Sequence, residues 1–192
     1  IVENMPVPLD FRVWKEARSL RDAGYLVTVL CPKGKGLNKT YELQEGIHIY
    51  RHPMPDEGNS PARYVWEYTC ALFWQFMYSC WIYLRRGFHV IQGCNPPDDI
   101  FLVALPFKLF GVKYIFDHHD VNPELYFSKY ERKDFLYNMQ LWLERATFRC
   151  SDVVMSTNNS YRQVAITRGA VSSDSVFVVR NGVDPERFRP VA

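Results

Sequence analysis

The chain has 192 residues, of which 47% are hydrophobic and 23% charged, and its formal net charge is +2. This length supports one sizeable hydrophobic core, and the composition excludes a disordered, collagen-like or disulfide-rich chain. Nucleic-acid binders usually carry a clustered basic stripe, whereas the lysines and arginines here are scattered among acids. We therefore expect one globular unit without a nucleic-acid partner.

The first predicted helix covers residues 10–23. Asp10 is placed to cap its N-terminus, and Gly24 ends it. Its apolar positions recur at intervals of three residues, which predicts an amphipathic helix. They are Phe11, Trp14, Ala17 and Leu20.

The remaining predicted elements alternate between strands and helices along the chain. Residues 1–4 read as the end of a first strand, so we expect further residues to precede them. Strands alternating with helices predict a doubly wound, mostly parallel Rossmann-like α/β sheet of about seven strands, with helices on both faces. Further strands are expected at 25–31, 46–51, 88–94, 112–117, 152–156 and 175–179, and further helices at 62–86, 97–110, 129–150 and 160–168.

The cysteines form no CxxC pair and their number is odd. Four of them lie in apolar or strand-like segments, where a free cysteine behaves as a small buried hydrophobe. With no recognisable signal peptide, this pattern favours a reducing, cytoplasmic location and argues against a zinc site. The five are Cys31, Cys70, Cys80, Cys94 and Cys150.

Candidate ligand-binding residues follow the predicted strands, because ligands of open α/β sheets bind beyond the carboxyl ends of the strands. We predict that His119 faces a gap beside Asn4 and Asn95, which a second lobe would close. The residues that follow the strands are Glu3 and Asn4, residues 92–95, residues 117–120, and Thr157 and Asn158.

The first strand-to-helix turn, residues 3–10, contains no glycine. Without glycine the backbone cannot easily approach a pyrophosphate, so a classical NAD or FAD site is disfavoured. A P-loop pattern is also absent from the sequence.

The segment Asp117-His118-His119-Asp120 contains four consecutive ionisable side chains, and three interpretations of it stay open. In an extended chain only alternate side chains point the same way, so at most alternate members could share a metal ion. A second interpretation is a structural histidine bonded to a neighbouring aspartate. The third is a substrate-contacting histidine oriented by an acidic neighbour at the end of a strand.

Four stretches in order resemble the N-terminal domain of family 4 glycosyltransferases, which are retaining enzymes of the GT-B fold. RVWKEARSLRDAGYLVTVL (residues 12–30) resembles the family's first helix and second strand. GFHVIQ (87–92), with Asn95-Pro96, resembles the strand before the acceptor helix. FDHHD (116–120), with Pro123-Glu124, is similar to the family's aspartate–any–histidine–aspartate segment. VVRNGVD (178–184), with Phe188, resembles the interdomain signature.

The resemblance implies that the histidine matching His119 contacts a hydroxyl of the donor sugar and assists the transition state, with Asp120 supporting it. His118 matches a variable position and is given a structural role. The implied reaction moves a hexose from a nucleotide-sugar to a glycan or lipid-linked acceptor, without metal or cofactor. The predicted substrate-binding residues are Asn4, Arg12, Asn95, Thr157 and Asn158, and the predicted interdomain hinge is Asn181 and Gly182.

Two features depart from the family pattern. The first loop contains prolines where the family has glycines, which weakens its implied phosphate contact. We assign residues 1–180 to the N-terminal, acceptor-side domain and residues 181–192 to an interdomain linker. The donor-nucleotide domain would then lie beyond this chain, which by itself is expected to be inactive.

Residues 64–84 are dense in aromatic side chains and are about long enough to cross a bilayer. Glu67 and Gln75 interrupt the segment, which favours a largely buried helix over a membrane span. A third possibility is a peripheral membrane contact at the inner face of the membrane, because tryptophan and tyrosine suit the headgroup region.

Two other functions use the same scaffold. A non-catalytic sugar or nucleotide sensor predicts tight ligand binding by this chain alone. A nucleotide-sugar epimerase of GT-B fold would release a changed nucleotide-sugar and would transfer no sugar.

Overall fold

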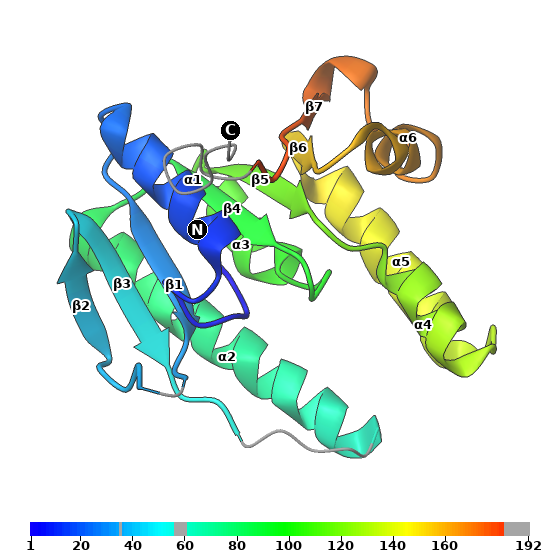
Figure 1. Cartoon of the computed structure of the whole chain (residues 1–192), viewed down its shortest axis with the longest axis horizontal. Coiled ribbons are helices and arrows are strands. Elements are labelled where there is room, and N and C mark those ends of the chain that lie inside the picture. Colours follow the sequence, from blue (N-terminus) through cyan, green and yellow to red (C-terminus); the bar gives the residue numbers. More distant parts are fainter. Residues whose placement is uncertain (35, 56–60, 183–192) are drawn as a thin grey trace, which may run out of the picture.

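The computed structural model of the chain describes residues 1–34, 36–55 and 61–182 (Figure 1). Two groups of strands make up its sheet. In the first, β1 (Thr28–Pro32) pairs in parallel with β3 (Ile47–His52), and β2 (Tyr41–Gln44) pairs antiparallel with β3. The second is parallel throughout, in the order β4 (Val90–Cys94), β5 (Lys113–His118), β6 (Val153–Ser156) and β7 (Val176–Val178).

The opening residues join the two groups of strands. Val2 forms parallel bridges to Leu30 of β1 and to Gly93 of β4. Its N–H donates to the Gln92 carbonyl at 2.7 Å, and its carbonyl accepts from Cys94 N–H at 3.0 Å. The segment therefore takes the place of a central strand between β1 and β4, and the predicted mostly parallel α/β fold is confirmed.

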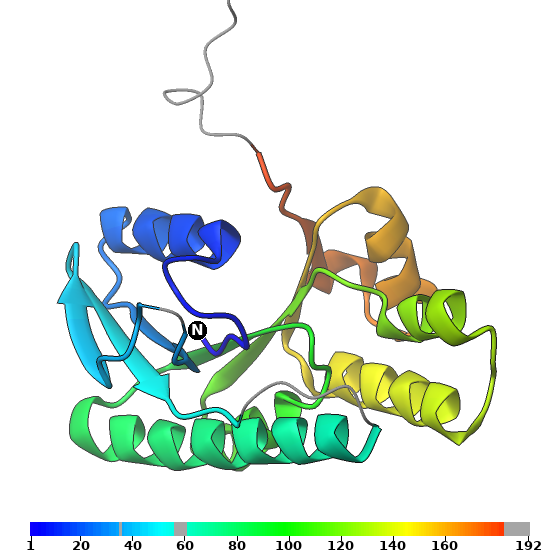
Figure 2. The ribbon, with the colours of Figure 1, turned by 60° about the horizontal axis from the view of Figure 1, so that its bottom comes forward.

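Helices cover both faces of the sheet, but unequally. Figure 2 shows α1 (Phe11–Asp22) on one side and α2 (Pro61–Arg86) and α5 (Phe135–Cys150) on the other. Between the last two, α3 (Phe101–Lys108) contacts both α2 and α5. Right-handed crossovers produce this division. From the central segment around Val2, the chain crosses to β1 through α1, and it later moves along the sheet in the opposite direction through α2 and α3. Helices of crossovers in opposite directions lie on opposite faces.

Each face of the sheet has its own hydrophobic core. On the α1 side, Val13 and Ala17 pack with Val29 and Ile49 of the sheet. On the other side, the buried cluster includes Phe116 of β5 and Phe148 of α5. Within the described residues, no helix is both long enough and apolar enough to cross a membrane.

The structure differs from the predicted elements in several places. The helix expected at 129–150 is two helices, α4 (Asn122–Tyr130) and α5. Glu131 takes a left-handed conformation with φ 51° and ends α4, and the Asp134 carboxylate caps α5 by accepting the N–H of Leu136 at 3.1 Å. The strand β2 was not predicted. It pairs only at one edge and none of its residues is fully buried, so its sequence lacks the apolar run of a central strand.

The helix predicted at 160–168 is confirmed as α6 (Asn159–Thr167), which packs on β6 and β7. The helix predicted at 97–110 is shorter, because α3 begins only at Phe101. A short 3₁₀ turn, Ser173–Ser175, leads into β7.

Gly93 of β4 allows close packing beneath the centre of the sheet. A Cβ atom at this position would lie 2.7 Å from Cγ2 of Ile100 and 3.0 Å from the hydroxyl of Tyr114. Gly93→Ala is therefore expected to lower the free energy of unfolding by about 1–3 kcal/mol through overpacking, measured by urea denaturation. The control is Gly182→Ala, because the nearest atom to a Cβ there is the Lys15 Nζ, 3.8 Å away. Equal stability of the two variants would contradict this account.

Candidate active site

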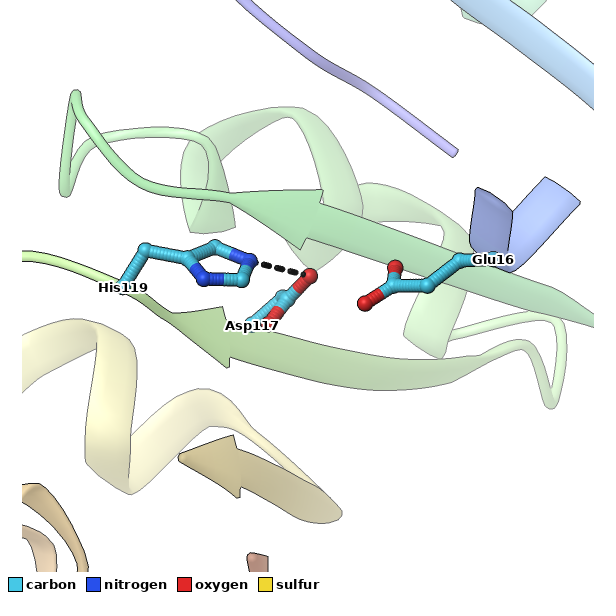
Figure 3. A group of neighbouring side chains, drawn as sticks. All are labelled: Glu16, Asp117 and His119. Atoms are coloured by element: carbon cyan, nitrogen blue, oxygen red, sulfur yellow. Dashed lines mark ion pairs between the residues drawn. The ribbon is translucent and has the colours of Figure 1, made fainter. Parts of the chain in front are cut away.

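A buried histidine and aspartate meet at the carboxyl end of β5. The Nε2 of His119 lies 2.8 Å from Oδ2 of Asp117, and both side chains are 2% exposed (Figure 3). The two residues are alternate members of an extended segment, so their side chains share the α1 side of the sheet. Asp117, and not the predicted neighbour Asp120, is thus the acidic partner that contacts the imidazole in this structure.

Side chains from two other elements complete this cluster. The amide nitrogen of Gln92, on β4, donates to Oε2 of Glu16 at 2.7 Å and to Oδ2 of Asp117 at 3.0 Å. Glu16 projects toward Asp117 from α1 (Figure 3). The Cys94 thiol donates to the same Asp117 oxygen at 3.5 Å. We name these four polar residues, Glu16, Gln92, Asp117 and His119, the acid–imidazole cluster.

Burial and mutual charge shift the pKa values in the acid–imidazole cluster. Burial, followed by the negative charge of Asp117, raises the pKa of Glu16 to about 7. Burial alone would lower the pKa of His119, but its close contact and charge interaction with Asp117 outweigh this and raise it. The cluster therefore favours an imidazolium beside the Asp117 carboxylate, with Glu16 close to its own titration near neutral pH.

Asn95 holds the loop that carries His119. Its Oδ1 accepts the backbone N–H of His119 at 2.6 Å and that of Asp120 at 3.1 Å. Its Nδ2 donates to the Asp120 carbonyl at 2.7 Å and to Oδ1 of Asp98 at 2.9 Å. The amide of Asn95 is thus used within the protein, which makes it a positioning residue for the His119 loop.

The His119 ring is more enclosed than its sequence position suggests. The residue lies beside Asn95 at the strand ends, as predicted, but it is only 6% exposed and does not face an open gap. Among the described residues, neither ring nitrogen has an aligned hydrogen-bond partner, so the contact with Asp117 is an ion pair. Because buried polar atoms are normally satisfied, the free Nδ1 indicates a position for a ligand hydroxyl.

His118 points to the opposite face of the sheet and is fully buried. Its ring lies 5.5 Å from that of Phe116, 5.1 Å from Phe148 and 5.2 Å from Tyr161, measured between ring centroids. Burial, aided by the charge of Arg168, lowers its pKa to about 4. This environment fits the structural role given to His118.

The other predicted substrate-binding residues lie around the same edge of the sheet. Arg12 is half-buried and donates through Nη2 to Oδ2 of Asp10 at 2.9 Å. Asn158 caps α6 by accepting the Tyr161 N–H at 2.9 Å, and its Nδ2 donates to Thr157 at 3.3 Å. Asn158 is therefore committed to a helix cap, and substrate contacts by Arg12, Thr157 and Asn158 stay predictions.

The predicted hinge lies at the end of the described chain. Asn181 and Gly182 are exposed, and the carbonyl of Gly182 accepts a hydrogen bond from Lys15 Nζ on α1 at 3.1 Å. Residues 183–192, the rest of the predicted linker, lie outside the described residues. The hinge role itself stays a prediction.

Two backbone N–H groups of the first loop, residues 3–10, donate hydrogen bonds within the protein. The buried Glu3 carboxyl accepts the N–H of Asn4 at 2.6 Å and that of Met5 at 3.0 Å. Burial, followed by the charge of Asp10, raises the pKa of Glu3 to about 8. A phosphate group could bind these amides only by replacing Glu3, in agreement with the expectation that this proline-containing loop is a poor phosphate site.

Glu16, Asp117 and His119 also form a set of metal-type ligands. One ligand atom of each lies within 4.8 Å of the others, in the part of the chain that the structure describes. The Gln92 amide, however, already donates to both carboxylates. Each carboxylate has a second oxygen that this amide does not contact, so the three residues could still hold a cation, and the absence of a metal stays a prediction.

A broad groove of about 1880 Å³ extends from α1 along β4 to the C-terminal part of α2, and it passes next to this cluster. Arg12 and Glu16 of α1 line it, together with Gln92 of β4 and the hinge residues Asn181 and Gly182. Asp117 and His119 lie behind Gln92 and Glu16, so the groove reaches the acid–imidazole cluster through these two side chains.

The sequence alone does not show the roles of Glu16 and Gln92. Gln92 is marked in it only as a residue near the end of a predicted strand. The pairing of Asp117 with His119 had a usable signal, because alternate residues of a strand share a face. Nothing local marks Glu16, because its partner lies 76 residues away.

The fold agrees with known structures. A domain of sucrose-phosphate synthase from Thermosynechococcus elongatus superimposes with a TM-score of 0.65 at 13% identity, covering 97% of this chain and 90% of that one. A glycosyltransferase from Rickettsia africae gives a TM-score of 0.52 at 16% identity, covering 98% of this chain and 45% of that one. At such identities the likeness shows the fold alone, which is one half of a GT-B fold. No curated protein sequence matches.

The fold and the site therefore define this chain as a GT-B-type domain with a polar cluster at its strand ends. The family model described as a glycosyl transferase 4-like domain matches residues 11–182. The chain belongs to this family of glycosyltransferase domains. It spans less than half of the Rickettsia africae enzyme that it resembles.

Proposed function

We propose that this chain is the acceptor-side half of a retaining glycosyltransferase. The enzyme transfers a hexose from a nucleotide-sugar donor to a glycan or lipid-linked acceptor, and it requires a second domain to complete the donor site. The observation that carries the proposal is the buried Asp117–His119 pair with an unpartnered Nδ1, at the carboxyl end of β5 in a glycosyl transferase 4-like domain.

In this proposal the His119 imidazole donates a hydrogen bond to a hydroxyl of the donor sugar. Asp117 holds the ring and favours its protonated form, while Glu16 and Gln92 fix the Asp117 carboxylate. A sugar hydroxyl reaches the ring only when neighbouring side chains move, and closure of a second domain over the groove would supply that movement.

The reaction exchanges one bond at the anomeric carbon. The bond from the acceptor oxygen to this carbon forms while the bond to the nucleoside diphosphate oxygen breaks, with retention of configuration. The proton of the acceptor hydroxyl passes to the departing diphosphate. Negative charge develops on the departing diphosphate. An imidazolium that holds a hydroxyl of the donor sugar orients the sugar and favours this negative charge, and it acts more strongly in a water-excluded site than in solvent.

The test is a transfer assay with an enzyme that contains this chain and its second domain. A panel of labelled nucleotide-sugars is incubated with glycan and lipid-linked acceptors, and the products are separated by mass spectrometry. Transfer of the label to an acceptor, with release of nucleoside diphosphate, is the expected result. Conversion of the nucleotide-sugar into an isomer without transfer would instead support an epimerase, and tight binding without turnover would support a sensor.

A further inference from the structure

The helix α2 places its largest apolar side chains outside the molecule. Trp66, Phe73, Met77, Trp81 and Leu84 are all exposed, Leu84 by 84%. Their spacings of seven, four, four and three residues put them on one line along the helix. We name this row of five residues the α2 stripe.

The opposite side of α2 is buried and includes the polar side chains of Gln75 and Ser79 beside apolar ones. Ala71, Gln75, Ser79 and Ile82 face the sheet and are at most 4% exposed. The amide of Gln75 has no hydrogen-bond partner among the described residues. Other aromatic side chains of α2, such as Tyr78 and Tyr83, do pack against the core. The α2 stripe is therefore apolar surface that covering the sheet does not use, and it points to an external apolar partner.

The neighbouring helix widens this apolar surface. On α3 and the turn after it, Leu102, Leu105, Leu109 and Phe110 are also exposed. Helices α2 and α3 contact each other on the same side of the sheet. The α2 stripe alone extends over about 27 Å, at 1.5 Å per residue.

The charges around the stripe favour an anionic partner. Arg85 and Arg86 end α2, and the guanidinium of Arg85 lies 5.6 Å from the centroid of the Trp81 ring. Glu67 is the single acidic residue in the sequence of α2, and it is not part of the stripe. Tryptophans beside arginines on an apolar surface fit the interface of a bilayer, where rings enter the headgroup region and cations meet phosphates.

We propose that the α2 stripe, widened by the exposed leucines of α3, docks this domain on the surface of an anionic lipid bilayer. The helix lies in the plane of the interface with its aromatic row inserted. This contact lies on the face of the sheet opposite α1 and the acid–imidazole cluster, so docking leaves that cluster uncovered. It is independent of whether the chain transfers a sugar.

The experiment is co-sedimentation of the chain with vesicles of equal parts phosphatidylcholine and phosphatidylglycerol. The Phe73→Gln/Met77→Gln variant is expected to bind at least about tenfold more weakly, because binding scales with the inserted apolar area. Leu84→Gln is a second, milder variant that should bind severalfold more weakly. The matched control is Phe11→Gln, because Phe11 is an exposed aromatic residue on the opposite face of the sheet and should leave binding unchanged.

Three further measurements decide the interpretation. Thermal unfolding shows whether the variants keep the stability expected for exposed substitutions. Vesicles of phosphatidylcholine alone should bind more weakly, by about fivefold for each arginine that contacts the surface. Absence of vesicle binding, or equal binding by all variants, would overturn the proposal. So would a dimer that forms without lipid and is lost in the stripe variants, because a second copy would then cover the stripe.

Discussion

Replacing His119 by alanine is expected to lower sugar transfer by about 10²–10³-fold in an enzyme that carries this chain with its second domain. The substitution removes a ring that combines an ion pair to Asp117 with an unpartnered nitrogen at the strand ends. A group that stabilises transition-state charge affects kcat, so the loss should appear mainly in kcat and little in KM. Steady-state kinetics with a fixed acceptor and varied donor measures both.

The matched control is His89→Ala. His89 is exposed and immediately precedes β4, at the opposite edge of the sheet from His119. This variant should retain normal transfer, and circular dichroism should show that both variants are folded. Near-normal turnover of folded His119→Ala protein would refute the catalytic role that we propose for His119.

Replacing the neighbouring His118 by phenylalanine is expected to stabilise the domain, and increasingly so in acid. In the native state burial lowers the pKa of His118 to about 4, whereas an unfolded histidine has a pKa of about 6.5. The unfolded chain therefore takes up the proton first as the pH falls below about 6.5. This uptake costs the native protein stability that reaches about 3 kcal/mol near pH 4, and phenylalanine removes the cost.

The measurement is the free energy of unfolding of both proteins by urea denaturation between neutral and acidic pH. The difference between them should be smallest above pH 7 and grow as the pH falls. Some gain should be present at every pH, because both buried nitrogens of His118 lack a partner among the described residues. His89→Phe, at an exposed position, should show no such trend. A difference that does not change with pH would contradict the burial of His118 in an aromatic environment.

The two adjacent histidines have different environments because they are neighbours in an extended segment. His118 ends β5 and His119 directly follows it, so their side chains point to opposite faces of the sheet. His119 meets carboxylates on the α1 side, which raise its pKa, whereas His118 meets aromatic rings and the charge of Arg168, and its pKa falls. The pKa of each histidine therefore depends on the face of the sheet to which its side chain points.

The helix at residues 61–86 was anticipated in extent but not in orientation. Glu67 and Gln75, which interrupt the segment, favoured a largely buried helix over a membrane span. The structure instead buries Gln75 and Ser79 and exposes Phe73 and Met77. Both faces of this helix are rich in apolar residues, so its periodicity alone does not determine which face meets the sheet.

The sequence by itself determined the alternation of strands and helices, the parallel sheet and the family. These depend on local patterns: apolar runs for buried strands, three- and four-residue spacing for helices, and short ordered motifs. It also placed Asp117 and His119 on one side of a strand, because side-chain parity is a property of the backbone.

Only the tertiary structure decided what these two residues meet. Glu16 joins Gln92 across 76 residues, and Gln92 joins Asp117 across 25. The enclosure of His119, the break between α4 and α5, and the outward aromatic row of α2 likewise depend on how distant segments pack. Burial, charge proximity and pKa arise from neighbours in space, and a pattern along the chain specifies those neighbours only once the fold has brought them together.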